Sequence, residues 1–254
     1  MFDWSLLEEV FTVETLMTPR PALYTQDRDR VLDESQPFDL VPVTEVEKIV
    51  GVFVTNTNSQ HALTRDWLIS ADTSVPHLID LFVDTGKPGF LVLQRQEIVG
   101  VVTPADLNKM PARAYLYHII GRLETMLSNW MDRELQSDEI TSTLSKKRRE
   151  KVIENHSGLV EGNVDVKIIE TLYLSDLISI VEKRQNLREK LGYPSRNAAN
   201  RDLGGLNSLR NKAMHPVNPI LRTLPEDLVK LHERVLRTRE VLEKLKALSP
   251  KPAT

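Results

Sequence analysis

The sequence predicts a two-part protein, with an α+β N-terminal domain and an all-α C-terminal helical bundle. The first observation is an internal repeat in the first half of the chain, and the second is a change to helical periodicity after about residue 110. The third is charge. Residues 1–112 carry a formal net charge of −9 and residues 113–254 one of +6, although the 254-residue chain totals only −3. These observations place the domain boundary close to residue 112.

The repeat consists of two apolar strands joined by a charged turn, and it occurs twice with an offset of 49 residues, so that Gly51 aligns with Gly100. The two copies cover residues 40–53 and 89–102. Their strands are rich in β-branched residues and are bounded by residues that break strands, which is typical of short buried strands. Ahead of the second copy, residues 74–84 place apolar side chains at helical spacing. Two such units facing each other would bury one shared core.

The second half is expected to be helical. Apolar side chains recur three and four residues apart from Leu116 to Met131, which predicts a helix over residues 113–135. Further helices are expected over residues 138–155, 166–191 with a break near Ser175, 203–214, and 226–248 after Pro225. Residues 110–112 are expected to be a short linker, and residues 249–254 a frayed tail.

Composition excludes several classes of site. The chain has no cysteine, so disulfides, thiolate metal sites and cysteine nucleophiles are excluded. The histidines outside the motif discussed below lie too far apart for a metal site, and none is expected. Residues 1–11 contain three acidic and no basic residues, unlike a signal peptide, and no stretch approaches the roughly 18 apolar residues of a membrane span. A cytoplasmic protein without a membrane segment is therefore expected.

Residues 8–110 resemble a pair of cystathionine-β-synthase (CBS) repeats. The matching residues are Val13, Met17 and Pro19 at the start of the first copy, Val41-Pro42-Val43 on its core strand, and Gly100-Val101-Val102-Thr103-Pro104-Ala105-Asp106-Leu107 at the exit of the second. The resemblance implies paired β-α-β-β-α repeats that bind an adenine nucleotide (AMP, ADP, ATP or a related molecule) as a regulatory ligand.

Thr103 and Asp106 are the candidate nucleotide-binding residues. A carboxylate can accept two hydrogen bonds from a ribose diol, a hydroxyl can donate to a phosphate or ribose oxygen, and the helix N-terminus favours negative charge. The alternative is that Thr103 caps the helix and Asp106 balances its dipole. In the first copy these positions are Val54 and Thr57, and its helix region, residues 28–37, is short. At most one of the two sites is therefore expected to be intact.

Residues 113–248 resemble the HEPN superfamily (higher eukaryotes and prokaryotes nucleotide-binding), helical domains that often act as metal-independent ribonucleases. The matching residues are Arg210, Asn211 and His215. The bare Arg–His spacing is weak evidence, because it also occurs at Arg113 and His118, but the polar Asn211 and the helices ahead of it favour the later match. The resemblance implies a homodimer in which the motifs of two protomers face each other around one RNA phosphate.

The chemistry of these three residues suits RNA cleavage without a metal ion or any catalytic cofactor. Histidine can act as a base or an acid near neutral pH, arginine offers a bidentate fork to phosphate, and Asn211 could orient the substrate. On one unbroken helix Arg210 and His215 would point about 140° apart, but Pro216 biases His215 away from helical angles. The alternative is that Arg210 pairs with a carboxylate and His215 caps the helix end.

A basic run is a weaker candidate for contact with the RNA backbone, the alternative being a solvated helix face. It consists of Lys146, Lys147, Arg148 and Arg149. Together the two resemblances predict an adenine-nucleotide-regulated endoribonuclease that acts as a dimer, in a setting such as stress or phage defence. One alternative is a non-catalytic nucleotide-sensing and dimerisation or scaffold protein. Another is a toxin-type protein controlled by an antitoxin-like partner.

Overall fold

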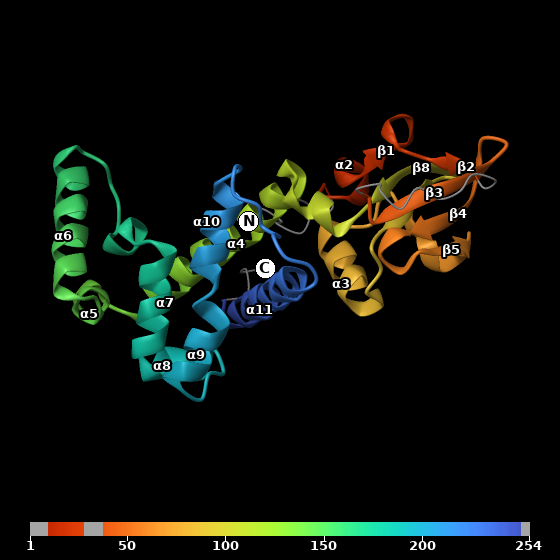
Figure 1. Cartoon of the computed structure of the whole chain (residues 1–254). Helices are drawn as coiled ribbons and strands as arrows, with labels where there is room; N and C mark the ends of the chain where they lie inside the picture. Colours follow the sequence, from red (N-terminus) through yellow and green to blue (C-terminus); the bar gives the residue numbers. More distant parts are fainter. Residues whose placement is uncertain (1–9, 28–37, 250–254) are drawn as a thin grey trace, which may run out of the picture. The chain divides into compact units, whose positions relative to one another are not determined.

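The computed structural model describes residues 10–27 and 38–249, which form two compact units (Figure 1). The first unit contains the described residues up to Tyr115 together with Pro216–His232, and the second contains Leu116–His215 and the described residues from Glu233 onward. Every described strand lies in the first unit, and the second is helical. The predicted mixed α/β first part and helical second part are therefore confirmed.

The described residues of the first unit form two four-stranded sheets. In one, the strand order is β2 (Gln26–Asp27), β3 (Leu40–Glu45), β4 (Lys48–Val54) and β5 (Ser59–Ala62). In the other, it is β1 (Thr18–Pro19), β8 (Glu97–Val102), β7 (Phe90–Gln94) and β6 (Leu68–Ser70). The centre of each sheet is an antiparallel hairpin, β3–β4 or β7–β8, so each copy of the repeat supplies the middle of one sheet.

The two hairpins pair their strands in the same register. Val43 lies opposite Gly51 in the first, Val92 lies opposite Gly100 in the second, and each ladder has an irregularity at the following residue. The equivalent pairs are 49 residues apart, which is the offset of the internal repeat. The paired strands of the two copies therefore fold alike.

One buried cluster takes side chains from both hairpins and forms the shared core expected from the repeat. Its members are Leu40, Ile49, Val52, Val54, Trp67, Leu91 and Val101. The predicted helix before the second copy is also present, as α3 (Val75–Thr85), which follows Ser74 and ends at Gly86 in a left-handed conformation with φ of 62°. The first copy's helix region, residues 28–37, lies outside the described residues.

Gly100 allows β1 to approach β8 closely. A Cβ at this position would lie 2.6 Å from the Thr18 backbone oxygen and 2.7 Å from the Met17 sulfur. Gly100→Ala is therefore expected to lower the free energy of unfolding by about 1–3 kcal/mol. Gly121→Ala, in an open position of a helix, is the matched control and is expected to raise it by about 0.5–1 kcal/mol. Urea unfolding of both variants checks the pair, and a Gly100→Ala protein as stable as wild type would contradict it.

The second unit is built from short helices. Six lie wholly within it: α5 (Ser137–Thr143), α6 (Lys146–Glu161), α7 (Leu174–Lys183), α8 (Gln185–Lys190), α9 (Arg196–Leu203) and α10 (Leu206–Met214). Two longer helices, α4 (Met110–Glu134) and α11 (Glu226–Leu248), contribute the parts beyond Tyr115 and His232. The predicted stripe on α4 is buried at Leu116, Leu123 and Trp130, and α11 has the predicted bounds. None of the described helices combines the length and the apolarity required to cross a bilayer.

Several helix predictions are wrong at their boundaries. Residues 138–155 are not one helix, because Leu144 and Ser145 are extended with ψ of 157° and 152° and separate α5 from α6. The break expected near Ser175 is present, since the 3-10 helix Ile168–Thr171 ends before Leu172 and α7 begins after Tyr173, but a second break at Arg184 was not predicted. The helix predicted over residues 203–214 begins only at Leu206, and α9 ahead of it was not expected.

The junction between the units also differs from the prediction. Residues 110–112 are the first turn of α4 rather than a linker. Pro111 is compatible with this position, because an N–H in the first turn of a helix has no acceptor within the helix. Residues 216–232, which the sequence places in the helical domain of residues 113–248, belong to the first unit. Of the predicted tail, only Ser249 lies within the described residues, where its hydroxyl donates to the Leu245 oxygen at 2.9 Å.

Candidate functional site

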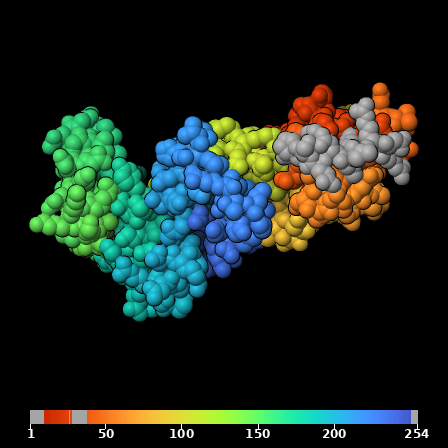
Figure 2. All heavy atoms as spheres, viewed as in Figure 1, coloured from red at the N-terminus to blue at the C-terminus, as the bar shows by residue number. Residues whose placement is uncertain are grey.

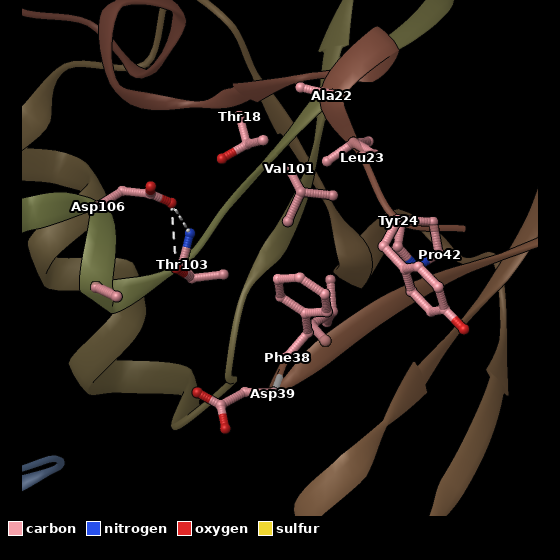
Figure 3. A pocket seen from close by; sticks show the side chains of 12 residues that line it. Thr18, Ala22, Leu23, Tyr24, Phe38, Asp39, Pro42, Val101, Thr103 and Asp106 are labelled. Atoms are coloured by element: carbon pink, nitrogen blue, oxygen red, sulfur yellow. Dashed lines mark hydrogen bonds between the residues drawn. The ribbon is translucent and has the colours of Figure 1, made fainter. Parts of the chain in front are cut away.

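A cavity of about 200 Å³ lies where the start of the first repeat meets the exit of the second (Figure 3). The predicted pair Thr103 and Asp106 lines it together with Pro42 of the core strand. Its other lining residues are Thr18, Ala22, Leu23, Tyr24, Phe38, Asp39, Leu40, Val101 and Ala105. Because β1 pairs with β8, Thr18 lies opposite Val101, and the two repeats contribute to the same cavity.

Asp106 lies in η4 (Pro104–Asn108), the short 3-10 helix that follows β8, and it is only 7 % exposed. Its Oδ2 accepts hydrogen bonds from the Thr103 backbone N–H at 2.7 Å and from the Thr103 hydroxyl at 3.1 Å. Its Oδ1 lies 2.7 Å from Lys109 Nζ. This is the capping arrangement of the alternative interpretation. A carboxylate offers about four acceptor positions, so Asp106 can still accept a hydrogen bond from a ligand.

Two aromatic side chains stand at the cavity. The rings of Tyr24 and Phe38 are stacked, with centroids 5.9 Å apart and planes inclined by 22°, and the two residues are 41 % and 47 % exposed (Figure 3). Thr55 fixes the neighbouring backbone, because its hydroxyl donates to the Phe38 oxygen at 2.5 Å and its N–H to the Asp39 oxygen at 3.1 Å. Exposed stacked rings held in this way offer a flat apolar surface to a planar ligand.

The electrostatics of the cavity disfavour a dense negative charge inside it. Among the described residues that line it, Asp39 and Asp106 are the charged ones, and both are acidic. Lys109, which is not part of the lining, contacts Asp106 through its ammonium group. Base and ribose suit such a lining better than phosphates, which are more stable near solvent.

The first copy lacks the equivalent groups. Val54 is buried, and the hydroxyl of Thr57, in η2 (Thr55–Thr57), lies 2.6 Å from the Ser59 hydroxyl. Neither side chain supplies the carboxylate that Asp106 supplies in the second copy.

The candidate catalytic residues lie at the end of α10. Arg210 is half-buried, and its Nε lies 3.7 Å from Oε2 of Glu124 on α4, which is longer than a hydrogen bond. Asn211 is exposed, and its backbone oxygen accepts the His215 N–H at 3.1 Å. His215 is exposed and extended, with φ of −105° and ψ of 91°, so it leaves the helix as Pro216 predicts. The carboxylate near Arg210 matches the alternative interpretation, whereas the exposed imidazole suits the catalytic one.

The basic run at the start of α6 divides into two kinds of side chain. Arg148 forms a bidentate pair with Asp176, with its Nη2 2.6 Å from Oδ2, and it covers the Tyr173 ring at 4.4 Å. The hydrogen bond to Asp176 raises the pKa of Arg148. Arg149 donates to the Thr141 oxygen at 2.9 Å. These two arginines therefore hold α5, α6 and α7 together, whose first two helices form the green lobe in Figure 2. Lys146 and Lys147 are exposed, and contact of the run with RNA stays a prediction.

Some residues at these sites could not be found in the sequence. Tyr24 and Phe38 lie on irregular segments without a periodic pattern, and Glu124 is far from Arg210 in the chain. The contact of Lys109 with Asp106 could have been predicted from the sequence, because the two residues are three positions apart near a helix start, a spacing typical of ion pairs.

No protein-family model and no curated protein matches the sequence. Among solved structures, the chain is similar to the CBS domain of a bacterial CNNM/CorC-family Mg²⁺ transporter in complex with ATP, with 18 % identity and a TM-score of 0.34 over 41 % of this chain and 89 % of that one. It is also similar to CBSX2 in complex with AMP, with 16 % identity and a TM-score of 0.34 over 41 % of this chain and 96 % of that one. The resemblance of residues 8–110 to CBS repeats and that of residues 113–248 to the HEPN superfamily both stay predictions.

Proposed function

We propose that the first unit binds one adenine nucleotide in the cavity that Thr103 and Asp106 line. The observation that supports this most strongly is the convergence of a buried carboxylate with the exposed Tyr24–Phe38 pair. The ribose diol would donate to Asp106, the base would lie against the aromatic rings, and the phosphates would extend toward solvent.

Isothermal titration calorimetry of the whole chain with adenosine, AMP, ADP, ATP and S-adenosylmethionine tests this part of the proposal. We expect at least one of them to bind with one site per chain, and GMP to bind more weakly. A chain that binds none of the five adenine compounds would refute the nucleotide site.

The second part of the proposal is that the helical unit is a metal-independent endoribonuclease. His215 would take the proton of a 2′-hydroxyl, whose oxygen attacks the adjacent phosphorus. The bond from phosphorus to the 5′-oxygen breaks, the leaving oxygen gains a proton, and a 2′,3′-cyclic phosphate remains. Arg210 would stabilise the charge on the phosphate oxygens, and Asn211 would orient the substrate. The exposed, non-helical position of His215 supports this role.

A homodimer is part of this proposal, because the Arg210–His215 motif of one protomer supplies a single histidine and a general acid is also needed. Light scattering of the purified chain is expected to give twice the mass of 29.0 kDa. A monomer with full activity would contradict the two-histidine site.

A second candidate is a non-catalytic sensor and scaffold, and the Arg210–Glu124 pair favours it, since a salt bridge alone accounts for the guanidinium. An antitoxin-like partner that covers His215 would be compatible with either candidate. Cleavage assays on the purified chain, described below, separate the two.

A further inference from the structure

A cluster of hydrogen bonds in the first unit ties the end of η4 to the segment that follows His215 in the chain. Asn108 Nδ2 donates to the Leu221 oxygen at 3.1 Å, and the Leu221 N–H donates back to Asn108 Oδ1 at 2.9 Å. Arg113 Nη2 donates to the Asn218 oxygen at 2.6 Å, and its Nε to the Asn108 oxygen at 2.9 Å. We call these four hydrogen bonds the 108–113 clamp.

The clamp is partly shielded from water, with Asn108 half-buried and Asn218 exposed. Arg113 is only 3 % exposed, and Ile220 and Leu221 are 3 % and 5 % exposed. Burial lowers the pKa of Arg113, yet a guanidinium remains charged at neutral pH, and a buried charge depends on its hydrogen-bond acceptors. The two bonds of Asn108 hold the N–H and the C=O of Leu221, and they therefore fix the two peptide groups on either side of this residue. Residues 218–221 therefore cannot shift far unless these bonds break or the end of η4 moves with them.

Lys109 connects the clamp to the cavity. Its Nζ lies 2.7 Å from Asp106 Oδ1, and its backbone oxygen accepts the Arg113 N–H at 3.2 Å. Oδ2 of Asp106 already accepts two hydrogen bonds, so a ribose diol bound there must share Oδ1 with the lysine. Ligand binding therefore changes a contact of Lys109. This lysine follows Asn108 in the chain, and its backbone oxygen accepts the hydrogen bond from the Arg113 N–H.

Only Pro216 and Val217 separate the clamped segment from His215. An extended chain spans at most about 3.6 Å per residue, and proline holds its own φ nearly constant. Pro216 and Val217 form a turn, so a displacement of Asn218 has only this short turn through which to reach the end of α10.

We propose that the 108–113 clamp transmits occupancy of the cavity to His215. Asn108 and Arg113 are its positioning residues, and Lys109 is the group that responds to the ligand. This regulation rests on the proposed function. It requires that the nucleotide favours one arrangement of the clamp over another, because a ligand shifts an equilibrium only through such a difference.

Hydrogen–deuterium exchange of the whole chain, with and without saturating AMP or ATP, tests the coupling independently of RNA cleavage. The peptide that covers residues 214–223 reports on the Leu221 N–H, which the clamp protects. We expect nucleotide to change the exchange rate of this peptide by about threefold or more in wild type, as a local shift in opening equilibrium would.

Asn108→Ala removes the paired bonds to Leu221 without touching the cavity lining. We expect it to bind nucleotide within about threefold of wild type and to exchange rapidly at residues 214–223 whether or not nucleotide is present. Asn155→Ala, which changes an exposed asparagine on α6, is the matched control and should respond like wild type. Lys109→Met keeps the clamp but removes the competitor for Asp106, so it should bind nucleotide at least as tightly and lose most of the response.

The outcomes separate the coupling from the function on which it rests. If wild type binds nucleotide without any change in exchange at residues 214–223, or if Asn108→Ala keeps the full response, the coupling is overturned and the nucleotide site stands. If wild type binds no nucleotide, the proposed sensor fails and the coupling fails with it.

Discussion

Replacing His215 by alanine is expected to lower the rate of RNA cleavage by at least about 100-fold, since positioned acid–base catalysis contributes factors of about 10²–10⁴. The variant should remain folded, because the imidazole lies exposed beyond the last turn of α10 and is not part of the buried core. The loss of activity would therefore appear in the chemical step. The assay is the cleavage of total RNA or a labelled oligonucleotide in EDTA, with cyclic-phosphate ends measured on the products.

The controls for this experiment come from the same chain. His77→Ala removes an exposed histidine on α3 and should leave cleavage unchanged. Arg210→Ala should lose activity to an extent similar to His215→Ala, whereas Arg210→Lys, which keeps the charge but not the fork, should recover only part of it. Wild type and both alanine variants giving the same RNA profile would contradict the nuclease and favour the scaffold.

Replacing Asp106 by alanine is expected to weaken nucleotide binding by about 10- to 100-fold, which corresponds to the loss of hydrogen bonds to a charged acceptor. Asp106→Ala also removes the cap on η4, where the carboxylate accepts two hydrogen bonds from Thr103. A destabilised η4 would weaken binding indirectly, so the melting temperature of each variant is measured beside its affinity.

Two further variants separate binding from capping. Asp106→Asn keeps the size of the side chain and one carbonyl acceptor for the Thr103 N–H, but it loses the negative charge. It should therefore be nearly as stable as wild type while binding nucleotide less tightly. Asp84→Asn, at an exposed position of α3, should bind normally. If Asp106→Asn and wild type bound nucleotide with equal affinity, the Asp106 carboxylate would not be a ribose ligand.

The strands and the longest helices could be predicted because their patterns are local and repeated. The 49-residue repeat appears again in the pairing of Val43 with Gly51 and of Val92 with Gly100. The breaks at Ser145 and Arg184 could not be predicted from the sequence pattern, because neither is marked by a glycine or proline, the residues that most often interrupt a helix.

The candidate sites could be predicted only in part. Thr103, Asp106 and His215 belong to short motifs and are visible in the sequence. Their neighbours are not, because the bonds between Asn108 and Leu221 join residues 113 positions apart, and no local pattern reports such a contact. Residues 216–232 are likewise far in sequence from the rest of the first unit, so no local pattern indicates that they belong to it.

We propose that nucleotide in the cavity controls RNA cleavage at His215. The most direct test is the rate of RNA cleavage by the wild-type chain in EDTA, measured with and without the adenine nucleotide that binds best. A change in rate of about fivefold or more, which corresponds to the low end of ordinary coupling free energies, is predicted, and Asp106→Ala should abolish it. Cleavage at the same rate with the nucleotide shown to be bound would contradict the account.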